Sequence, residues 1–194
     1  FTDFRYAESA RTVEGAEFVD AKRDLFQTLS ELLSGPIGFE ASSLSFERYS
    51  RLPAGGVEPV PRYGLVEELR AVKDDGELDA IRRAADIANI AFERFADEGG
   101  LVGRTERDLA WRFETFLHEA NADGVSFPAS VASGPNAAKP HTEPRDRRVE
   151  LGETVIVDAG CMVDGYCSDC TRTFFTGEPN GRLRELYDLC LQAQ

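Results

Sequence analysis

Two aspartates on the arms of a predicted β-hairpin are the strongest candidates for chemistry in this sequence. Asp158 and Asp169 flank Asp164-Gly165, a dipeptide that favours a two-residue hairpin turn. With this dipeptide as the turn, Asp158 faces Thr171; with the turn moved back by one residue, Asp158 lies directly opposite Asp169. In both registers the two carboxylates share one face, because side chains alternate along a strand. Such carboxylates repel each other unless water, a base or a cation lies between them, and hard divalent cations prefer oxygen ligands.

The spacing of this pair leaves two interpretations open: a divalent-metal site, or a hydrated surface hairpin that binds nothing. Asp158 favours the first interpretation, because it directly follows Val155-Ile156-Val157, an apolar run that is typical of a buried strand. The other face of the hairpin should pack against helices. That face receives Val155, Val157, Cys170 and Phe174.

The histidines and cysteines offer further candidates. His141 lies between prolines in Pro140-His141-Thr142-Glu143-Pro144, where it is either an exposed loop side chain or a proton carrier that contacts substrate. We expect His118 to lie on a helix surface or at the edge of the core. Neither has a His partner three to five residues away, which argues against a zinc finger. Cys167 and Cys170 form C-x-x-C, but residues three apart on a strand point to opposite faces, so we expect no zinc or redox site there.

Two amphipathic helices are predicted upstream of the hairpin. The first begins after Asp74 or Asp75 and ends at Gly99-Gly100; the second begins at Thr105, with Asp108 as a shortened capping partner. Their apolar stripes predict the faces that are buried. These are Leu78, Ile81, Ala85, Ala88, Phe92 and Phe95 in the first helix, and Leu109, Phe113, Phe116, Leu117 and Ala120 in the second.

Strands and a long loop complete the region around the candidates. Strands are predicted at 125–133 (interrupted by Pro128), 154–158 and 168–176. The polar loop over 133–152 carries His141, and loops of that length tend to be functional. A last helix begins after Asn180 and reaches Gln194 without a stop signal. Because residue 1 is also not Met, we expect this sequence to be a piece truncated at both ends.

The first third of the sequence is a smaller mixed segment. It predicts a helix over 25–33, a short strand over 37–39 and a helical turn over 45–51. A cluster of breakers over 52–56 follows, with Pro59 and Pro61 soon after. We therefore expect two domains, 1–65 and 66–194.

Composition excludes several classes of protein. The net charge is −13, from 35 acidic and 22 basic residues, which argues against nucleic-acid binding. There is no apolar run of about 18 residues and no signal-peptide pattern, so we expect a cytoplasmic protein without a membrane span. Only three of the basic residues are Lys, as on a salt-adapted surface, although a merely acidic protein is the alternative. All four cysteines lie in the last 34 residues, unlike a secreted disulfide framework.

Four stretches together resemble the pita-bread metallopeptidase family, which includes aminopeptidase P, prolidase, methionine aminopeptidase and the non-metal creatinase. They are 127–136, 140–144, 151–160 and 165–173. The helix over 72–85 resembles the helix that opens the family's catalytic domain, and Thr2-Asp3-Phe4-Arg5-Tyr6 resembles the N-terminal domain of the Xaa-Pro-cleaving branch. The resemblance implies an α+β fold: a partial catalytic domain with helices on an antiparallel sheet, preceded by part of a creatinase-type α/β domain.

The resemblance also implies a two-metal site built from two Asp, one His and two Glu. Asp158 matches the Asp that holds one metal, Asp169 matches the Asp that bridges both, and His141 matches a loop His that contacts substrate and handles protons. The other His and both Glu belong to motifs beyond Gln194. We therefore expect two Mn, Co or Zn ions in the complete enzyme, but only weak or partial metal binding and no activity in these residues alone.

The family's activity would be hydrolysis of the bond before proline, in dipeptides or peptides, by a metal-activated water in a homodimeric enzyme. One alternative is a protein-binding module without catalysis on the same fold, whose members usually replace the ligand positions. Another is a metal-free hydrolase of the creatinase type, which lacks the ligating carboxylates. Both Asp158 and Asp169 are retained here, which favours the peptidase.

Overall fold

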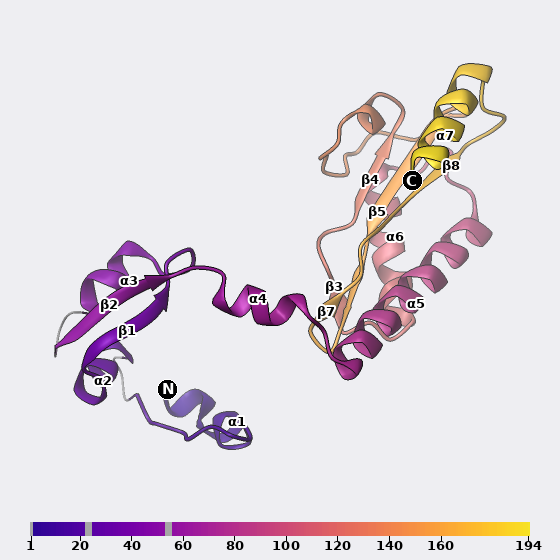
Figure 1. Cartoon of the computed structure of the whole chain (residues 1–194). Helices are drawn as coiled ribbons and strands as arrows, with labels where there is room; N and C mark the ends of the chain where they lie inside the picture. The colour runs from indigo at the N-terminus through magenta and orange to yellow at the C-terminus, as the bar shows by residue number, and fades with distance from the viewer. Residues whose placement is uncertain (1, 22–24, 53–55) are drawn as a thin grey trace. The chain divides into compact units, whose positions relative to one another are not determined.

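The computed structural model describes residues 2–21, 25–52 and 56–194, and the chain divides into two compact units (Figure 1). The first unit is Phe1–Val72 and the second is Lys73–Gln194. Residues 53–55 of the predicted breaker cluster lie outside the described residues. Each unit is built from its own helices and strands.

The first unit is a small α/β segment. Its strands β1 (Gly35–Glu40) and β2 (Val57–Arg62) pair in parallel. Its helices are η1 (Phe4–Tyr6), α1 (Ala7–Arg11), α2 (Leu25–Leu32), α3 (Phe46–Arg51) and α4 (Leu65–Ala71). The predicted helix over 25–33, strand over 37–39 and helical turn over 45–51 are confirmed.

Strand β2 is one of the elements of this unit that the sequence does not predict, with η1, α1 and α4. Pro59 and Pro61 indicate a break, yet both lie inside the strand, paired with Ile37 and Phe39 of β1. In a two-stranded sheet each strand is an edge, and every second N–H of an edge strand points away from its partner. Proline can occupy such positions without losing a ladder hydrogen bond.

The second unit consists of two long helices packed on antiparallel strands. The helices are α5 (Asp75–Glu98) and α6 (Glu106–Glu119). The strands are β3 (Gly124–Val125), β4 (Ser130–Ser133), β5 (Thr154–Ala159), β6 (Cys161–Val163), β7 (Tyr166–Cys167) and β8 (Cys170–Phe175). They form two sheets, of order β4-β5-β8 and β3-β6-β7. Figure 1 shows α5 and α6 running along the strands, and α7 (Gly181–Ala193) follows β8.

Local capping explains where these helices begin. Asp74 accepts the N–H of Glu77 at 2.9 Å, and the Glu77 carboxylate accepts the N–H of Asp74 in return. Thr105 and Asp108 form the same reciprocal box at the start of α6. Both predicted helix starts are confirmed. Among the described residues, no helix combines the length and the apolar character that crossing a membrane requires.

The buried stripe of α5 differs from the predicted one. Phe92, Phe95 and Ala88 are buried as predicted, but Ala85 is exposed, and Leu78 and Ile81 are only half-buried. The buried positions in the first half of the helix are Ala80 and Ala84, which the prediction misses. Small side chains are needed on this face because the sheet comes close: the Cys161 thiol lies 3.2 Å from the carbonyl oxygen of Ala84.

The hairpin adopts the first of the two predicted registers. Val163 pairs with Tyr166, and Asp158 pairs with Thr171 rather than with Asp169. The predicted apolar face is confirmed, because Val155 and Val157 are fully buried in the core while Cys170 and Phe174 pack against it. The ladder is interrupted at Gly160 on one arm and at 168–169 on the other. This interruption separates the two sheets.

Candidate functional site

His141 and Asp158 line one open cavity of about 370 Å³, although they come from different parts of the second unit. Asp158 lies on β5, whereas His141 lies in the loop between η2 (Gly134–Ala138) and β5. The other lining residues are Phe127, Pro128, Ser130, Pro140, Thr142 and Glu143. The wall is thus formed by the 127–130 segment, the 140–143 segment and the middle of the sheet. The volume and the mixed polar and apolar lining of this cavity are typical of sites that bind small molecules.

The carboxylate of Asp158 is oriented by its neighbours on the sheet. Its flanking residues Val157 and Ala159 are fully buried, which fixes the backbone, while Asp158 itself is half-buried. The Thr171 hydroxyl donates a hydrogen bond of 2.7 Å to its Oδ1 atom. An ionised carboxylate has about four lone-pair sites. Asp158 can therefore accept this hydrogen bond and still bind a further ligand from the cavity.

The loop that carries His141 is fastened beside the central strand. Ser130, which pairs with Asp158 across the sheet, donates its hydroxyl to the carbonyl oxygen of Thr142 at 2.8 Å. The imidazole of His141 is exposed, as the simpler interpretation predicts, but it also lines the cavity. His118, near the end of α6, is exposed on the helix surface.

Asp169 lies outside that cavity, in the interruption between β7 and β8. Its side chain is exposed, and it is two residues before Thr171, the partner of Asp158. Among the described residues, no three His, Cys, Asp or Glu side chains are grouped closely enough to hold a metal ion. The two aspartates supply the oxygen donors that a hard divalent ion prefers, but they are fewer than the six to eight ligands of a full set.

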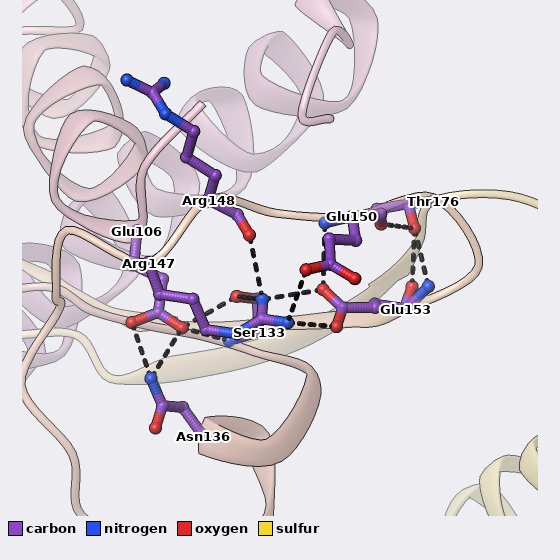
Figure 2. Close-up of polar contacts among 8 residues, drawn as sticks. All are labelled: Glu106, Ser133, Asn136, Arg147, Arg148, Glu150, Glu153 and Thr176. Atoms are coloured by element: carbon purple, nitrogen blue, oxygen red, sulfur yellow. Dashed lines mark hydrogen bonds and ion pairs between the residues drawn. The ribbon is translucent and has the colours of Figure 1, made fainter. Parts of the chain in front are cut away.

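One buried acidic residue escapes the sequence interpretation. Glu106, in the first turn of α6, has no exposed surface. Figure 2 shows its carboxylate contacting Asn136, close to Ser133 and Arg147. Its spacing could have revealed it, because Glu106 precedes Leu109, Ala110 and Phe113 by three, four and seven residues. That spacing places it on the buried face of the helix.

An ion pair braces the other end of the same polar cluster (Figure 2). The guanidinium of Arg147 donates to both carboxylate oxygens of Glu153, and Glu153 also accepts the N–H of Glu150 at 3.0 Å. The Thr176 hydroxyl donates to the carbonyl oxygens of Glu150 and Glu153 and accepts the N–H of Glu153. The cluster thus ties the beginning of β5 to the residue after β8.

This ion pair predicts how stability depends on pH. The hydrogen bond from Arg147 holds the pKa of the Glu153 carboxyl below its usual value. A lowered folded-state pKa stabilises the protein above the unfolded pKa of about 4.3, and this contribution is lost as pH falls through the folded pKa. We expect Glu153→Gln to lower the free energy of unfolding by about 1–3 kcal/mol at pH 7 and by much less at pH 3.

Urea denaturation at both pH values measures this difference. The control is Glu185→Gln, because Glu185 forms a solvent-exposed pair with Arg182 and such pairs contribute little. An equal loss at both pH values for Glu153→Gln would contradict the prediction.

Comparison with known proteins gives consistent likenesses. The sequence model of metallopeptidase family M24 matches residues 79–194, and that of the creatinase/prolidase N-terminal domain matches residues 1–72. A peptidase of Bacillus subtilis, YqhT, is 34% identical over 200 residues, covering all of this chain and 56% of its own length. An Xaa-Pro dipeptidase of Pyrococcus furiosus is 35% identical over 130 residues, covering 67% of this chain and 37% of its own.

A solved structure is similar over nearly the whole chain. The Xaa-Pro dipeptidase from Bacillus anthracis superposes with a TM-score of 0.92 at 36% identity, covering 98% of this chain and 55% of that one. These two relatives, YqhT and the Bacillus anthracis dipeptidase, match nearly all of this chain, which spans only about half of their own length.

Proposed function

The chain belongs to metallopeptidase family M24, and from this membership we propose that the full-length protein is a metal-dependent exopeptidase that cleaves before proline. The membership confirms the resemblance and the α+β fold expected from the sequence. The main observation that supports this proposal is the cavity that both His141 and Asp158 line, in a chain whose relatives include Xaa-Pro dipeptidases. The substrates would be proline-containing dipeptides or peptide N-termini.

We assign Asp158 and Asp169 as ligands of two divalent ions, Mn, Co or Zn; the remaining His and two Glu would come from residues outside this sequence. Bound ions of this kind lower the pKa of a water molecule and polarise a carbonyl group. Thr171 keeps the Asp158 carboxylate in one orientation. During hydrolysis, the C–N bond before proline breaks, the carbonyl carbon gains a hydroxyl and the proline nitrogen gains a proton. We propose that His141, which lines the cavity, delivers that proton.

The direct test is hydrolysis by the complete protein in the presence of Mn²⁺. We expect release of proline from Ala-Pro and no measurable cleavage of Ala-Ala. A protein-binding module would cleave neither peptide, and a creatinase-type hydrolase would keep its activity after chelation with EDTA. Cleavage of both dipeptides at similar rates would contradict the proposed specificity.

We further propose a cytoplasmic homodimer. Sedimentation of the complete protein would test whether it is a dimer.

Replacing the loop histidine should separate catalysis from metal binding. We expect His141→Ala in the complete protein to lower kcat by about 100-fold or more, because positioned proton transfer typically contributes that much. Metal content, measured by plasma mass spectrometry, should stay unchanged. The exposed His118 supplies the control, since His118→Ala removes the other imidazole without touching the cavity. A His141→Ala variant with unchanged kcat would remove His141 from the mechanism.

A further inference from the structure

The buried carboxylate of Glu106 lies beneath the loop that carries His141. Glu106 is at the first position of α6, and none of its surface is exposed. Burying a carboxylate is costly unless its oxygens accept hydrogen bonds from the protein. The groups that bind this carboxylate therefore show what the residue holds in place.

The hydrogen-bond donors to the Glu106 carboxylate all belong to one segment, 133–145. Its Oε1 atom accepts the Ser133 N–H and the Ser133 hydroxyl, both at 2.8 Å. Its Oε2 atom accepts the Arg145 N–H at 3.1 Å. The side-chain amide of Asn136 donates to both oxygens at 3.1 Å, as Figure 2 shows. The partners thus include the first residue of this segment, its last residue and a buried residue in η2.

The backbone of α6 strengthens the same attachment. The N–H groups of Glu106 and Arg107 donate to the carbonyl oxygens of Arg147 and Arg145, at 3.0 and 3.1 Å. Unpaired N–H groups at a helix start need such acceptors. The start of α6 therefore binds the C-terminal end of the loop through its backbone. The Glu106 side chain also binds the N-terminal end of the loop, at Ser133.

The hydrogen bonds require a carboxylate at this position. Each oxygen of Glu106 receives at least two donors, and a glutamine would turn its own NH₂ group toward some of these donors instead of an acceptor. The Ser133 hydroxyl also accepts a hydrogen bond of 2.8 Å from Arg147, so its own proton is directed to Glu106. Arg147 thereby places a positive charge one hydrogen bond away from the buried carboxylate.

We propose that Glu106 is a positioning residue that fixes both ends of the 133–145 loop and thereby holds His141 in the cavity it shares with Asp158. The effect on catalysis rests on the proposed function, whereas the effect on the loop does not. Without Glu106, the loop would keep the Ser130–Thr142 hydrogen bond beside His141 but lose the side-chain bonds at its ends. His141 would then occupy many positions, few of them near a substrate.

The first experiment measures the loop directly. Hydrogen exchange with mass spectrometry is followed in the complete protein and in its Glu106→Gln variant. We expect exchange at 133–145 to rise by about tenfold or more, while exchange in α5 and β5 stays unchanged. The control is Glu98→Gln, because Glu98 is another carboxylate that accepts hydrogen bonds from the protein, from Arg104 and Arg112, but at the end of α5. Unchanged exchange at 133–145 in Glu106→Gln would overturn the proposal.

The second experiment links the loop to His141. We expect Glu106→Gln to lower kcat for Ala-Pro by about 10- to 100-fold, as misplacement of a reacting group typically does. Adding Glu106→Gln to His141→Ala should lower kcat no further, because both changes remove the same contribution. A purely structural role would lower the melting temperature but leave kcat per folded molecule unchanged. That result, or additive losses in the double variant, would overturn the positioning role.

Two provisions keep these outcomes separate. If Glu106→Gln does not fold, Asn136→Ala removes one donor pair and is expected to show the same two effects with smaller amplitude; normal exchange and kcat in that variant would overturn the proposal. If the unaltered complete protein cleaves neither Ala-Pro nor a longer peptide with proline at its second position, the proposed function fails, and the exchange experiment alone still decides whether Glu106 holds the loop.

Discussion

Asp169→Asn in the complete protein should reduce cleavage of Ala-Pro by at least about 100-fold. Mutating a residue that only hydrogen-bonds to a metal ligand already lowers metal affinity or activity about 10- to 100-fold, and losing a ligand should cost more. The substitution preserves the shape of the side chain but removes the negative charge of a residue that we propose as a metal ligand. Since Asp169 is exposed and lies between β7 and β8, the change should leave the fold intact. Metal content should fall with activity, from two ions per chain toward one or none.

The neighbouring turn offers a matched control for this experiment. Asp164 is exposed, forms a surface ion pair with Arg83 and has a positive φ of 49° that asparagine also tolerates. Asp164→Asn therefore removes the same charge from the same hairpin without affecting a proposed ligand. Plasma mass spectrometry and steady-state kinetics would be measured on both variants. If Asp169→Asn retained full activity with two ions bound, the ligand assignment would be wrong.

Gly160→Ala should destabilise the second unit by roughly 3 kcal/mol or more, the upper part of the range for overpacking. A Cβ atom at this position would overlap the carbonyl oxygen of Ser168 and lie 2.6 Å from its carbonyl carbon. That oxygen cannot easily move, because it accepts the Ser126 hydroxyl at 2.7 Å. Ser126 also donates its N–H to Gly160, so three segments are fixed at one point. Asp169, next to Ser168, would shift with them.

A second glycine of the same sheets isolates this steric effect. Gly124, on β3, has ordinary space for a Cβ atom, with the nearest group being the Met162 methyl at 3.8 Å. We expect Gly124→Ala to change the free energy of unfolding by less than about 1 kcal/mol. Urea denaturation followed by circular dichroism gives both values. Equal stability of the two variants would show that the hairpin can open around residue 160.

The fold could be predicted from the sequence where local interactions determine it. Asp74 and Thr105 begin their helices because capping involves residues only three apart. Asp164 and Gly165 set the hairpin register through their own backbone preferences, so the facing of Asp158 and Thr171 was among the predicted alternatives. In each case the stabilising groups lie within a few residues of each other in the sequence.

The features that were missed depend on distant parts of the chain. In α5, Ala84 rather than Ala85 faces the core because Cys161 approaches the helix at Ala84. The two contacting residues are 77 positions apart in the sequence. Glu106 is buried because Ser133, Asn136 and Arg145 supply its donors. Helical spacing alone identifies a face, but it does not identify the neighbour against which that face packs. Only the family resemblance predicts that His141 and Asp158 belong to the same site.

Two hydrogen bonds near the cavity close chain segments of different length. The Asp158–Thr171 bond joins residues 13 apart, whereas the Glu106–Arg145 bond joins residues 39 apart. A threefold longer loop costs about 1 kcal/mol more chain entropy to close. The aspartate hairpin should therefore assemble earlier in folding than the histidine loop, and the loop should detach without unfolding the hairpin. Such an order of opening would let the acidic side stay assembled while the histidine side exchanges between docked and released states.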